Sequence, residues 1–447
     1  MRRQRIERFA VHNLAPVLVF LVLAMLQGTY YMHAVGPLTM PDPDLHATTS
    51  YAVATGQVFN PTVTKTDEHG NPVKVQPLVG DSRYLENENF RNVLVSSLLD
   101  EPFTKDKHDA LQQGANRETP RTVTIPNAHM RNRSNQYVPI AYLPQGIGLA
   151  IGMHTGHSPY DSWQMGRQAN LVMFLMLFSL AIMLAPRGKF LLVLIGVIPQ
   201  TAFISSSLMA DASYIGISAC FVALVLRFAD RGSRLSLIEF AGLTASAVLL
   251  FSCKGVYAAE ALLALALPAA VLSWRRKGVF AALVAVLAAV PYLVWHARFG
   301  GMLARVNVGD NIAFMTRYPI RVLKIILWNI CQLPQTIPDL PGVGALAVAA
   351  VVGGWILATA NAGRTNPPDD LAGWWRSYRY AAIAVIVAVA VLTAIYASLM
   401  ATWMDMPDLP LTGEVEGFQG RYLLPLAPLL LCSVVVGGRR NETDDAA

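Results

Sequence analysis

Long apolar runs alternate with short polar segments along most of the chain. A helix needs about 17 to 25 mostly apolar residues to cross a hydrocarbon core of about 30 Å. Runs of this kind predict about ten transmembrane helices. They cover Leu14 to Gly36, Met165 to Leu184, Phe190 to Ser206, Ala212 to Phe228, Leu237 to Cys253, Val256 to Trp274, Val279 to His296, Gly342 to Ala360, Tyr380 to Thr402 and Tyr422 to Val436. We therefore expect an all-α polytopic membrane protein.

The polar residues divide the chain into four parts. Residues 1–36 hold the N-terminus and the first span, and residues 37–164 are polar enough to form a large first extracytoplasmic loop domain. Residues 165–437 form a multi-span membrane domain, and residues 438–447 form a tail. Within the membrane domain, residues 318–340 mix Arg, Lys, Trp and Pro with Ile and Leu, which is typical of an interfacial helix.

The loop domain carries local signals of its own. The residues between Asp44 and Gly56 predict a short helix with Asp44 as its N-cap and Gly56 at its end. Turn residues within Asn60 to Asn89 predict short strands or coil, and Phe90 to Leu99 predicts a short amphipathic helix. Gly146 to Met153 is apolar but short, so we expect it at the membrane interface.

Composition and charge agree with this topology. Hydrophobic residues make up 54% of the chain and charged residues 14%, whereas a soluble domain carries about 25% charged residues. Lys and Arg concentrate near both ends and in alternate short loops, which predicts cytoplasmic N- and C-termini and an outer loop domain. A basic rim beside anionic lipid accounts for the net charge of +6, so no nucleic-acid partner is required.

Several kinds of chemistry find no support in the sequence. Cys220, Cys253, Cys331 and Cys432 lie in apolar surroundings without metal-ligand spacing, so they encode neither a disulfide framework nor a zinc site. No phosphate-binding Walker loop and no dinucleotide-binding glycine pattern occur, and the predicted cytoplasmic loops are too short to hold a nucleotide sugar. The sequence assigns no cofactor, and it leaves a divalent cation open.

Two acids and an imidazole follow the first predicted span directly. Asp42, Asp44 and His46 stand at the mouth of that helix and outside the lipid, where a membrane-embedded enzyme would keep a base. Each residue also has a structural interpretation. Asp42 suits a solvated turn between two prolines, Asp44 suits an N-cap, and His46 suits a packed position on the short helix.

The chain carries short motifs in a fixed order: Asp42…His46…Gly56, Tyr137-x-Pro139-x-x-Tyr142-x-Pro144, Gly166-Arg167, Ser207-x-x-x-Asp211, Lys254-x-x-Tyr257 and Gln419-Gly420-Arg421-Tyr422-Leu423-Leu424-Pro425. In these motifs, over almost its whole length, the chain resembles the bacterial membrane family named domain of unknown function 2142 (DUF2142). That family in turn resembles the C-type membrane glycosyltransferases (GT-C). The resemblance implies a GT-C-like fold in the bacterial plasma membrane, an acidic catalytic motif in the first outer loop, and a polyprenyl-phosphate sugar as donor.

The acidic motif departs from the usual pattern of the family. The family reads Pro-Asp-Glu, whereas here Pro43 stands in place of the Glu and the second acid is Asp44. Inverting sugar transfer needs a carboxylate that takes the proton of the acceptor hydroxyl. Asp42 suits that role, and Asp44 is the alternative candidate for the base.

Three cations stand at predicted outer helix ends. Lys254 interrupts an apolar stretch of about twice the spanning length, and a lysine at the bilayer centre is costly by about 2.5 to 3.5 kcal/mol. We therefore expect the chain to turn there. Lys254, Arg421 and Arg167 would converge on the phosphate of a lipid-linked donor, with snorkelling at the interface as the alternative.

Further site candidates come from the same motifs. They are Tyr137, Tyr142, Asp211, Tyr257, Glu260, Gln419 and Tyr422. Asp211 also suits the N-cap of its span. Glu260 lies within an apolar stretch, where an acid needs a partner or a water-filled cavity.

These observations favour a membrane glycosyltransferase that moves a sugar from a polyprenyl-phosphate donor to an envelope glycan, glycolipid or protein acceptor on the outer face. The partners would be that donor, the acceptor and the lipid bilayer. A transporter or flippase of lipid-linked sugars is the alternative, as is a non-catalytic assembly subunit. A transporter more often shows two related halves with helices broken at matching places, whereas here the polar residues gather in one loop.

Overall fold

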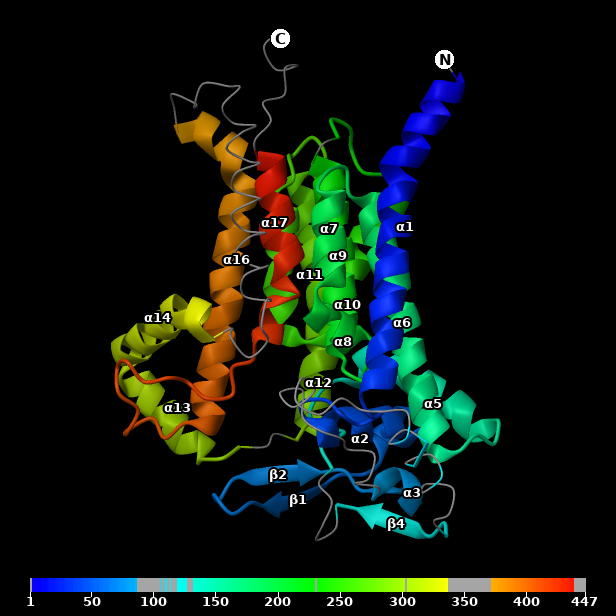
Figure 1. Cartoon of the computed structure of the whole chain (residues 1–447). Coiled ribbons are helices and arrows are strands. Elements are labelled where there is room, and N and C mark those ends of the chain that lie inside the picture. The colour runs from blue at the N-terminus through cyan, green and yellow to red at the C-terminus, as the bar shows by residue number, and fades with distance from the viewer. Residues whose placement is uncertain are drawn as a thin grey trace.

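The computed structural model is a helical bundle with a small domain of strands and short helices at one end (Figure 1). It describes residues 2–86, 106, 109–110, 113, 119–126, 132–229, 231–301, 304–336 and 371–437. Three predicted segments, Phe90 to Leu99, Gly342 to Ala360 and the tail 438–447, lie outside the described residues.

Five helical segments among the described residues are long and apolar enough to cross a membrane. They lie in α1 (Arg2–Ala34), α6 (Pro159–Leu184), α9 (Asp211–Ala229), the continuous run of α11 (Trp274–Val284), η6 (Ala285–Ala289) and α12 (Val290–Arg298), and α16 (Leu371–Trp403). The prediction of a polytopic membrane protein is confirmed, and the described residues are mainly helical, although two small β-sheets depart from a strictly all-α fold. The count of about ten spans stays a prediction.

The span predicted over Phe190 to Ser206 is not one helix. It is divided into α7 (Lys189–Val197) and α8 (Pro199–Ser205). Pro199 has no backbone N–H to continue the hydrogen-bond ladder, so the first helix ends before it and a second one begins at it.

The apolar stretch around Lys254 does break there, as its charge predicts. The helix α10 (Leu237–Cys253) ends directly before Lys254, which has an extended backbone with a φ of −157°. The next segment, η5 (Gly255–Ala266), is a 3-10 helix and is shorter than the predicted span. The last span is likewise short, with a 3-10 turn, η7 (Gly420–Leu423), followed by α17 (Leu426–Gly437).

The loop domain combines a β-hairpin and a second two-stranded sheet with short helices. The strand β1 (Val63–Thr66) pairs antiparallel with β2 (Pro72–Val75), and β3 (Leu78–Asp81) pairs antiparallel with β4 (Thr122–Ile125). The short helices are α2 (Pro43–Ala54), η1 (Gln57–Phe59), α3 (Ser82–Leu85), η4 (Pro139–Tyr142) and α5 (Leu143–His154). We call this end of the bundle the hairpin end. The first residue of α1 and the last of α17 lie at the opposite end (Figure 1).

The start of α2 differs from the prediction. The helix begins at Pro43, so Asp42 occupies the N-cap position and Asp44 lies inside the first turn. The prediction of Asp44 as N-cap is therefore wrong. Proline favours the first helical position, where its missing N–H needs no partner. The Asp42 side chain makes no capping hydrogen bond, which leaves its carboxylate available for other contacts.

Close packing against α5 holds α2 and α6 in place. A Cβ atom added at Gly152 would lie 2.7 Å from the Cα atom of Ser162 on α6, so only glycine allows these two helices to approach so closely. A Cβ atom added at Gly146 would likewise collide with the side chain of Val53 on α2. The apolar segment Gly146 to Met153, predicted at the membrane interface, is therefore part of the helix α5, which packs against α2 and α6.

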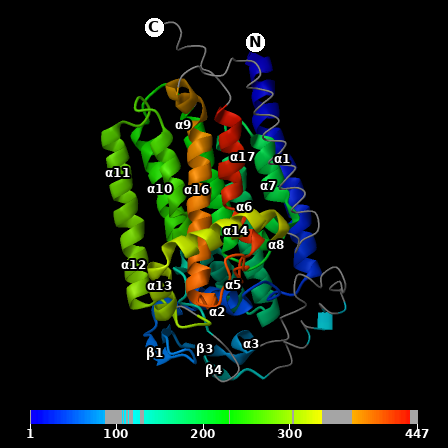
Figure 2. The same ribbon diagram turned by 90° about the vertical axis from the view of Figure 1, so that its left-hand side faces the viewer.

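Two amphipathic helices cross the outside of the bundle. The helices α13 (Val308–Arg317) and α14 (Pro319–Thr336) run across α16 near the hairpin end (Figure 2). On α14, Ile325 and Ile326 are buried, whereas Ile320 and Leu323 are exposed. This pattern covers most of the segment predicted as interfacial, residues 318–340, and its contact with lipid stays a prediction.

Candidate active site at the hairpin end

An ion pair joins the acidic motif after the first span to the motif Gln419 to Pro425 near the C-terminal end of the described chain. One Oδ atom of Asp42 lies 2.8 Å from an Nη atom of Arg421. The Asp42 backbone is in the left-handed region with a φ of 52°, the one non-glycine residue of the described chain with a positive φ. Such a conformation is unfavourable for most residues, and it is tolerated best by Asn and Asp. It directs the Asp42 carboxylate toward the buried guanidinium.

A second acid approaches the same arginine from α9. Asp211 is the first residue of that helix, so it is not its N-cap. An Oδ atom of Asp211 lies 3.9 Å from the Nε atom of Arg421, too far for a hydrogen bond. The Arg421 side chain is 7% exposed and that of Asp211 is 4% exposed. The two acids therefore flank one desolvated cation.

Arg133 completes this group from the loop domain. One Nη atom of Arg133 lies 3.3 Å from Oδ1 of Asp42 and 3.6 Å from Oδ1 of Asp44. Sequence reasoning did not identify Arg133, because nothing in its local sequence separates it from the other arginines of the loop. We call Asp42, Asp44, Arg133, Asp211 and Arg421 the acid–arginine cluster.

Lys254 lies beside the cluster in a cage of tyrosines. Its Nζ atom is 4.4 Å from the ring centre of Tyr422, and three further rings lie at 5.5 to 5.8 Å, those of Tyr137, Tyr214 and Tyr257. Cation–π attraction to the ring faces holds the ammonium in place. Within the described residues the Lys254 ammonium forms no ion pair and no hydrogen bond, although the Lys254 backbone forms hydrogen bonds with Leu250 and Tyr257. Tyr214 was not predicted, although it follows Asp211 by three residues on one helix face.

His46 is buried against Tyr142. Its Nδ1 atom lies 2.9 Å from the Tyr142 hydroxyl, and its Nε2 atom is buried without a hydrogen-bond partner in the described chain. Burial and the positive charge of Arg421 lower the pKa of His46 to about 3, so the imidazole is neutral at physiological pH.

The surrounding charges also set the state of Asp42. Burial raises the pKa of the Asp42 carboxyl, but the charges of Arg421 and Arg133 lower it by more, so the net pKa lies below its ordinary value. Asp42 is therefore ionised at neutral pH, and it is a weak base while both arginines are in contact with it.

Two sequence candidates lie apart from these contacts. Arg167 is buried with its guanidinium on backbone carbonyls of Tyr31, Val35 and Ser206, at 2.7 to 3.1 Å. It thus satisfies carbonyls at the ends of α1 and α8, and the structure does not bring it to the acid–arginine cluster. Gln419 flanks η7, and its backbone carbonyl accepts a hydrogen bond from Tyr422.

The described part of the chain offers few side chains that could together bind a metal ion. No group of three or more His, Cys, Asp or Glu side chains there is arranged to hold a metal ion. Both Asp42 and Asp44 face arginine instead.

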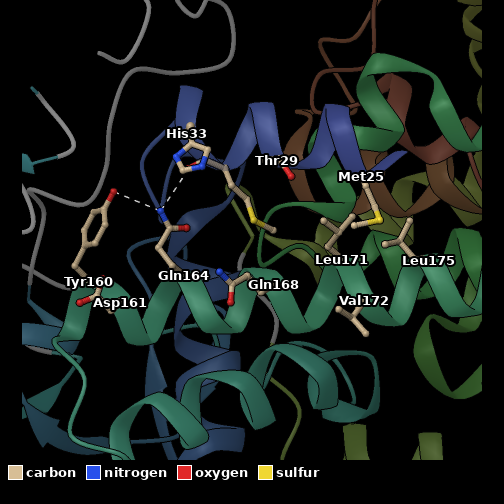
Figure 3. A pocket seen from close by; sticks show the side chains of 11 residues that line it. Met25, Thr29, His33, Tyr160, Asp161, Gln164, Gln168, Leu171, Val172 and Leu175 are labelled. Carbon is tan, nitrogen blue, oxygen red and sulfur yellow. Dashed lines mark hydrogen bonds between the residues drawn. The ribbon is translucent and has the colours of Figure 1, made fainter. Parts of the chain in front are cut away.

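A groove of about 540 Å³ lies on another side of the bundle, between α1 and α6 (Figure 3). Met25, Leu171 and Leu175 line one part of it, and Tyr160 and Gln164 line the other. No residue of the acid–arginine cluster lines this groove. It is therefore separate from the candidate active site.

Comparison with known proteins identifies a family and no characterised relative. The family model described as "Predicted membrane protein (DUF2142)" matches residues 25–430, which include the whole cluster and Lys254. No curated protein and no solved structure matches the chain.

Proposed function

The chain belongs to the DUF2142 family of predicted membrane proteins, and we propose that it is a membrane glycosyltransferase that uses a polyprenyl-phosphate sugar as donor. The observation that carries the proposal is the 2.8 Å ion pair between Asp42 and Arg421, with the Lys254 ammonium next to it. The carboxylate can accept the proton of an acceptor hydroxyl, and the guanidinium and the ammonium can bind a phosphate leaving group. Among the described residues, the ammonium has no acid partner.

The reaction assigns one role to each charge. An acceptor hydroxyl attacks the anomeric carbon, a new C–O bond forms, and the bond from that carbon to the phosphate oxygen breaks. The bonding electrons leave with polyprenyl phosphate, and the hydroxyl proton passes to the Asp42 carboxylate. Lys254 and Arg421 stabilise the negative charge that develops on the phosphate.

Donor binding would also activate the base. Arg421 lowers the pKa of Asp42 in the resting protein. A phosphate group that draws Arg421 away from Asp42 removes part of that effect, so the carboxylate becomes a stronger base once the donor is bound. This coupling favours proton transfer once the donor is bound.

Lys254 suits the first contact with the phosphate. The acids of the cluster already neutralise Arg133 and Arg421, whereas Lys254 has only aromatic neighbours among the described residues. An anion that enters the cage gains a charge-assisted contact without breaking an existing ion pair. Snorkelling alone does not account for a lysine held among four tyrosine rings.

A membrane location is supported by the five candidate spans. We extend the proposal to the bacterial plasma membrane, with cytoplasmic termini and the hairpin end outside. The basic segments of the sequence favour this orientation. The acceptor would then be an envelope glycan, glycolipid or protein.

A transfer assay tests the function directly. Purified full-length protein in lipid nanodiscs is given a panel of polyprenyl-phosphate hexoses and pentoses, or the matching nucleotide sugars, with an envelope extract as acceptor. We expect transfer from a lipid-linked donor and a transfer rate lower by about 10² to 10⁴ in the Asp42→Asn variant. Transfer from the nucleotide sugar alone would overturn the mechanism. Movement of the lipid-linked sugar across proteoliposomes without transfer would assign the protein as a flippase.

A further inference from the structure

A buried carboxyl group lies on η5, outside the acid–arginine cluster. Residues three apart in a 3-10 helix lie on one face, because the helix has 3.0 residues per turn. Lys254, Tyr257 and Glu260 follow this spacing, and both Tyr257 and Glu260 are fully buried. This face of η5 meets the segment from Arg421 to Pro425.

Hydrogen bonds connect two backbone carbonyls of the segment Arg421 to Pro425 to this side of the bundle. The Tyr257 hydroxyl donates a hydrogen bond to the Tyr422 carbonyl at 3.1 Å. Ser218 on α9 stands between Glu260 and Pro425. Its Oγ atom lies 2.7 Å from Oε2 of Glu260 and 2.6 Å from the carbonyl oxygen of Pro425.

These two distances require a second proton. Both are normal lengths for O–H···O hydrogen bonds. A serine hydroxyl has one proton, a carbonyl has none, and an ionised carboxylate only accepts. With Glu260 ionised, one of the two contacts would bring together two oxygen atoms without a proton. With Glu260 protonated, its O–H donates to Ser218, and Ser218 donates to Pro425.

We propose that Glu260 is a protonated carboxylic acid at neutral pH, and that it is a proton-binding positioning residue for the segment that carries Arg421. The ligand of this site is a single proton. Loss of the proton would place a negative charge among buried groups and turn the Ser218 hydroxyl toward Glu260. The Pro425 carbonyl would then lose its donor, and the segment would lose one of these two hydrogen bonds.

Among the described residues, no compensating charge lies next to Glu260. The described titratable side chains on η5 and the elements packed against it include Tyr257, Tyr214 and Cys220, Cys253, and Tyr380 and Tyr396. All of these are neutral at neutral pH. The charged residues of the neighbouring helices face elsewhere. Glu239 of α10 pairs with Arg231, and Asp211 of α9 lies beside Arg421. Arg227 of α9 lies near Lys189, and Arg379 of α16 lies over the ring of Tyr380.

Infrared spectroscopy tests the protonation state without any transfer assay. Full-length protein in nanodiscs is compared with Glu260→Gln at neutral and alkaline pH, and with Glu416→Gln as an exposed control. We expect a carboxylic C=O band in the wild type and in the Glu416→Gln protein that is missing from the Glu260→Gln protein. The band should disappear at high pH. Identical neutral-pH spectra for wild type and Glu260→Gln would overturn the proposal.

Two further measurements keep the test decisive if a variant folds poorly. Dicyclohexylcarbodiimide reacts with protonated carboxyl groups in apolar surroundings, and mass spectrometry of the labelled wild type should locate the adduct at Glu260. In thermal unfolding, Glu260→Gln should stay near the wild type because its amide N–H donates to Ser218, whereas Glu260→Ala should be lower. Equal losses in both variants, or labelling elsewhere only, would reject the role. None of these measurements uses sugar transfer. The protonation of Glu260 is therefore tested separately from the proposed function.

Discussion

An Oδ atom of Asp42 lies 2.8 Å from an Nη atom of Arg421, although 379 residues separate them along the chain. This contact brings the acidic motif after the first span and the Gln419 to Pro425 block before the last helix into one site. Arg421 is 95% buried by this arrangement, with an exposed fraction of 5%. A buried cation with two acids beside it is costly to leave unpaired, so the pair links the two ends of the protein as well as serving chemistry.

The first prediction concerns the base. Asp42→Asn should lower the transfer rate by about 10² to 10⁴, the usual contribution of a general base. Asparagine tolerates the left-handed backbone of position 42, so backbone strain does not explain the loss. The rate of transfer from a polyprenyl-phosphate sugar is the measurement.

Asp44→Asn is the matched control for this prediction. Asp44 contacts Arg133 at 3.6 Å and does not reach Arg421 through an ion pair among the described contacts. We expect a much smaller loss of rate in this variant. If Asp42→Asn keeps full activity and Asp44→Asn does not, Asp44 is the base.

The second prediction concerns the donor phosphate. Lys254→Gln should raise KM for the lipid-linked donor by about tenfold or more, because a charge-assisted contact contributes about 1.5 to 3 kcal/mol. Lys65→Gln, at an exposed position on β1, should leave KM unchanged. An unchanged KM for the donor in Lys254→Gln would show that Lys254 does not bind the donor phosphate.

Arg421 provides a complementary test of phosphate binding. Arg421→Ala should weaken donor binding more than Arg421→Lys, because lysine keeps the charge and loses only the bidentate fork. Direct binding of a polyprenyl-phosphate sugar at several salt concentrations measures this, and the residual affinity should fall as salt rises. Equal affinity of the alanine and lysine variants would contradict a role for the charge.

Some of these features follow from the sequence and others require the fold. The break at Lys254 is predictable because a lysine in the middle of an apolar stretch is costly in lipid. The N-cap was misplaced because Pro43 begins α2 one residue before the expected cap. The placement of Arg133 against Asp42 and Asp44 depends on how distant segments pack, and no local pattern encodes that choice. The same holds for Arg167, whose partners are carbonyls at the ends of two other helices.

The third prediction concerns topology. The cluster places Asp42 and Arg421 at one end of the bundle with Lys254, and the charge pattern places Arg231 and Arg364 on the cytoplasmic side. Arg364 lies outside the described residues. In a cysteine-free background, a cysteine at exposed Lys65 should react with a membrane-impermeant maleimide added to intact cells, and a cysteine at position 231 should not. Labelling of a cysteine at position 231 from outside would show that the predicted orientation in the membrane is wrong.

The fourth prediction concerns acid stability and depends on His46. The pKa of His46 falls from 6.5 to about 3 in the folded protein. Between these values the unfolded chain binds a proton that the folded one does not, so stability rises with pH and is lost as the pH falls below about 6.5. The slope from this one group is at most about 1.4 kcal/mol per pH unit.

Replacing His46 should therefore flatten the acid side of the stability profile. Thermal unfolding of His46→Asn in nanodiscs, measured from pH 7 to pH 4, should show a smaller fall in Tm than the wild type, whereas His157→Asn at an exposed position should match the wild type. The Asp42 ion pair is lost only below the ordinary carboxyl pKa of 3.8, because the folded-state pKa of Asp42 is lowered. Glu260 also differs in protonation between the folded and unfolded chain in this window, but it contributes equally to the wild type and to His46→Asn, so the difference between the two profiles isolates His46. An unchanged profile in His46→Asn would show that its imidazole is not held neutral by the fold.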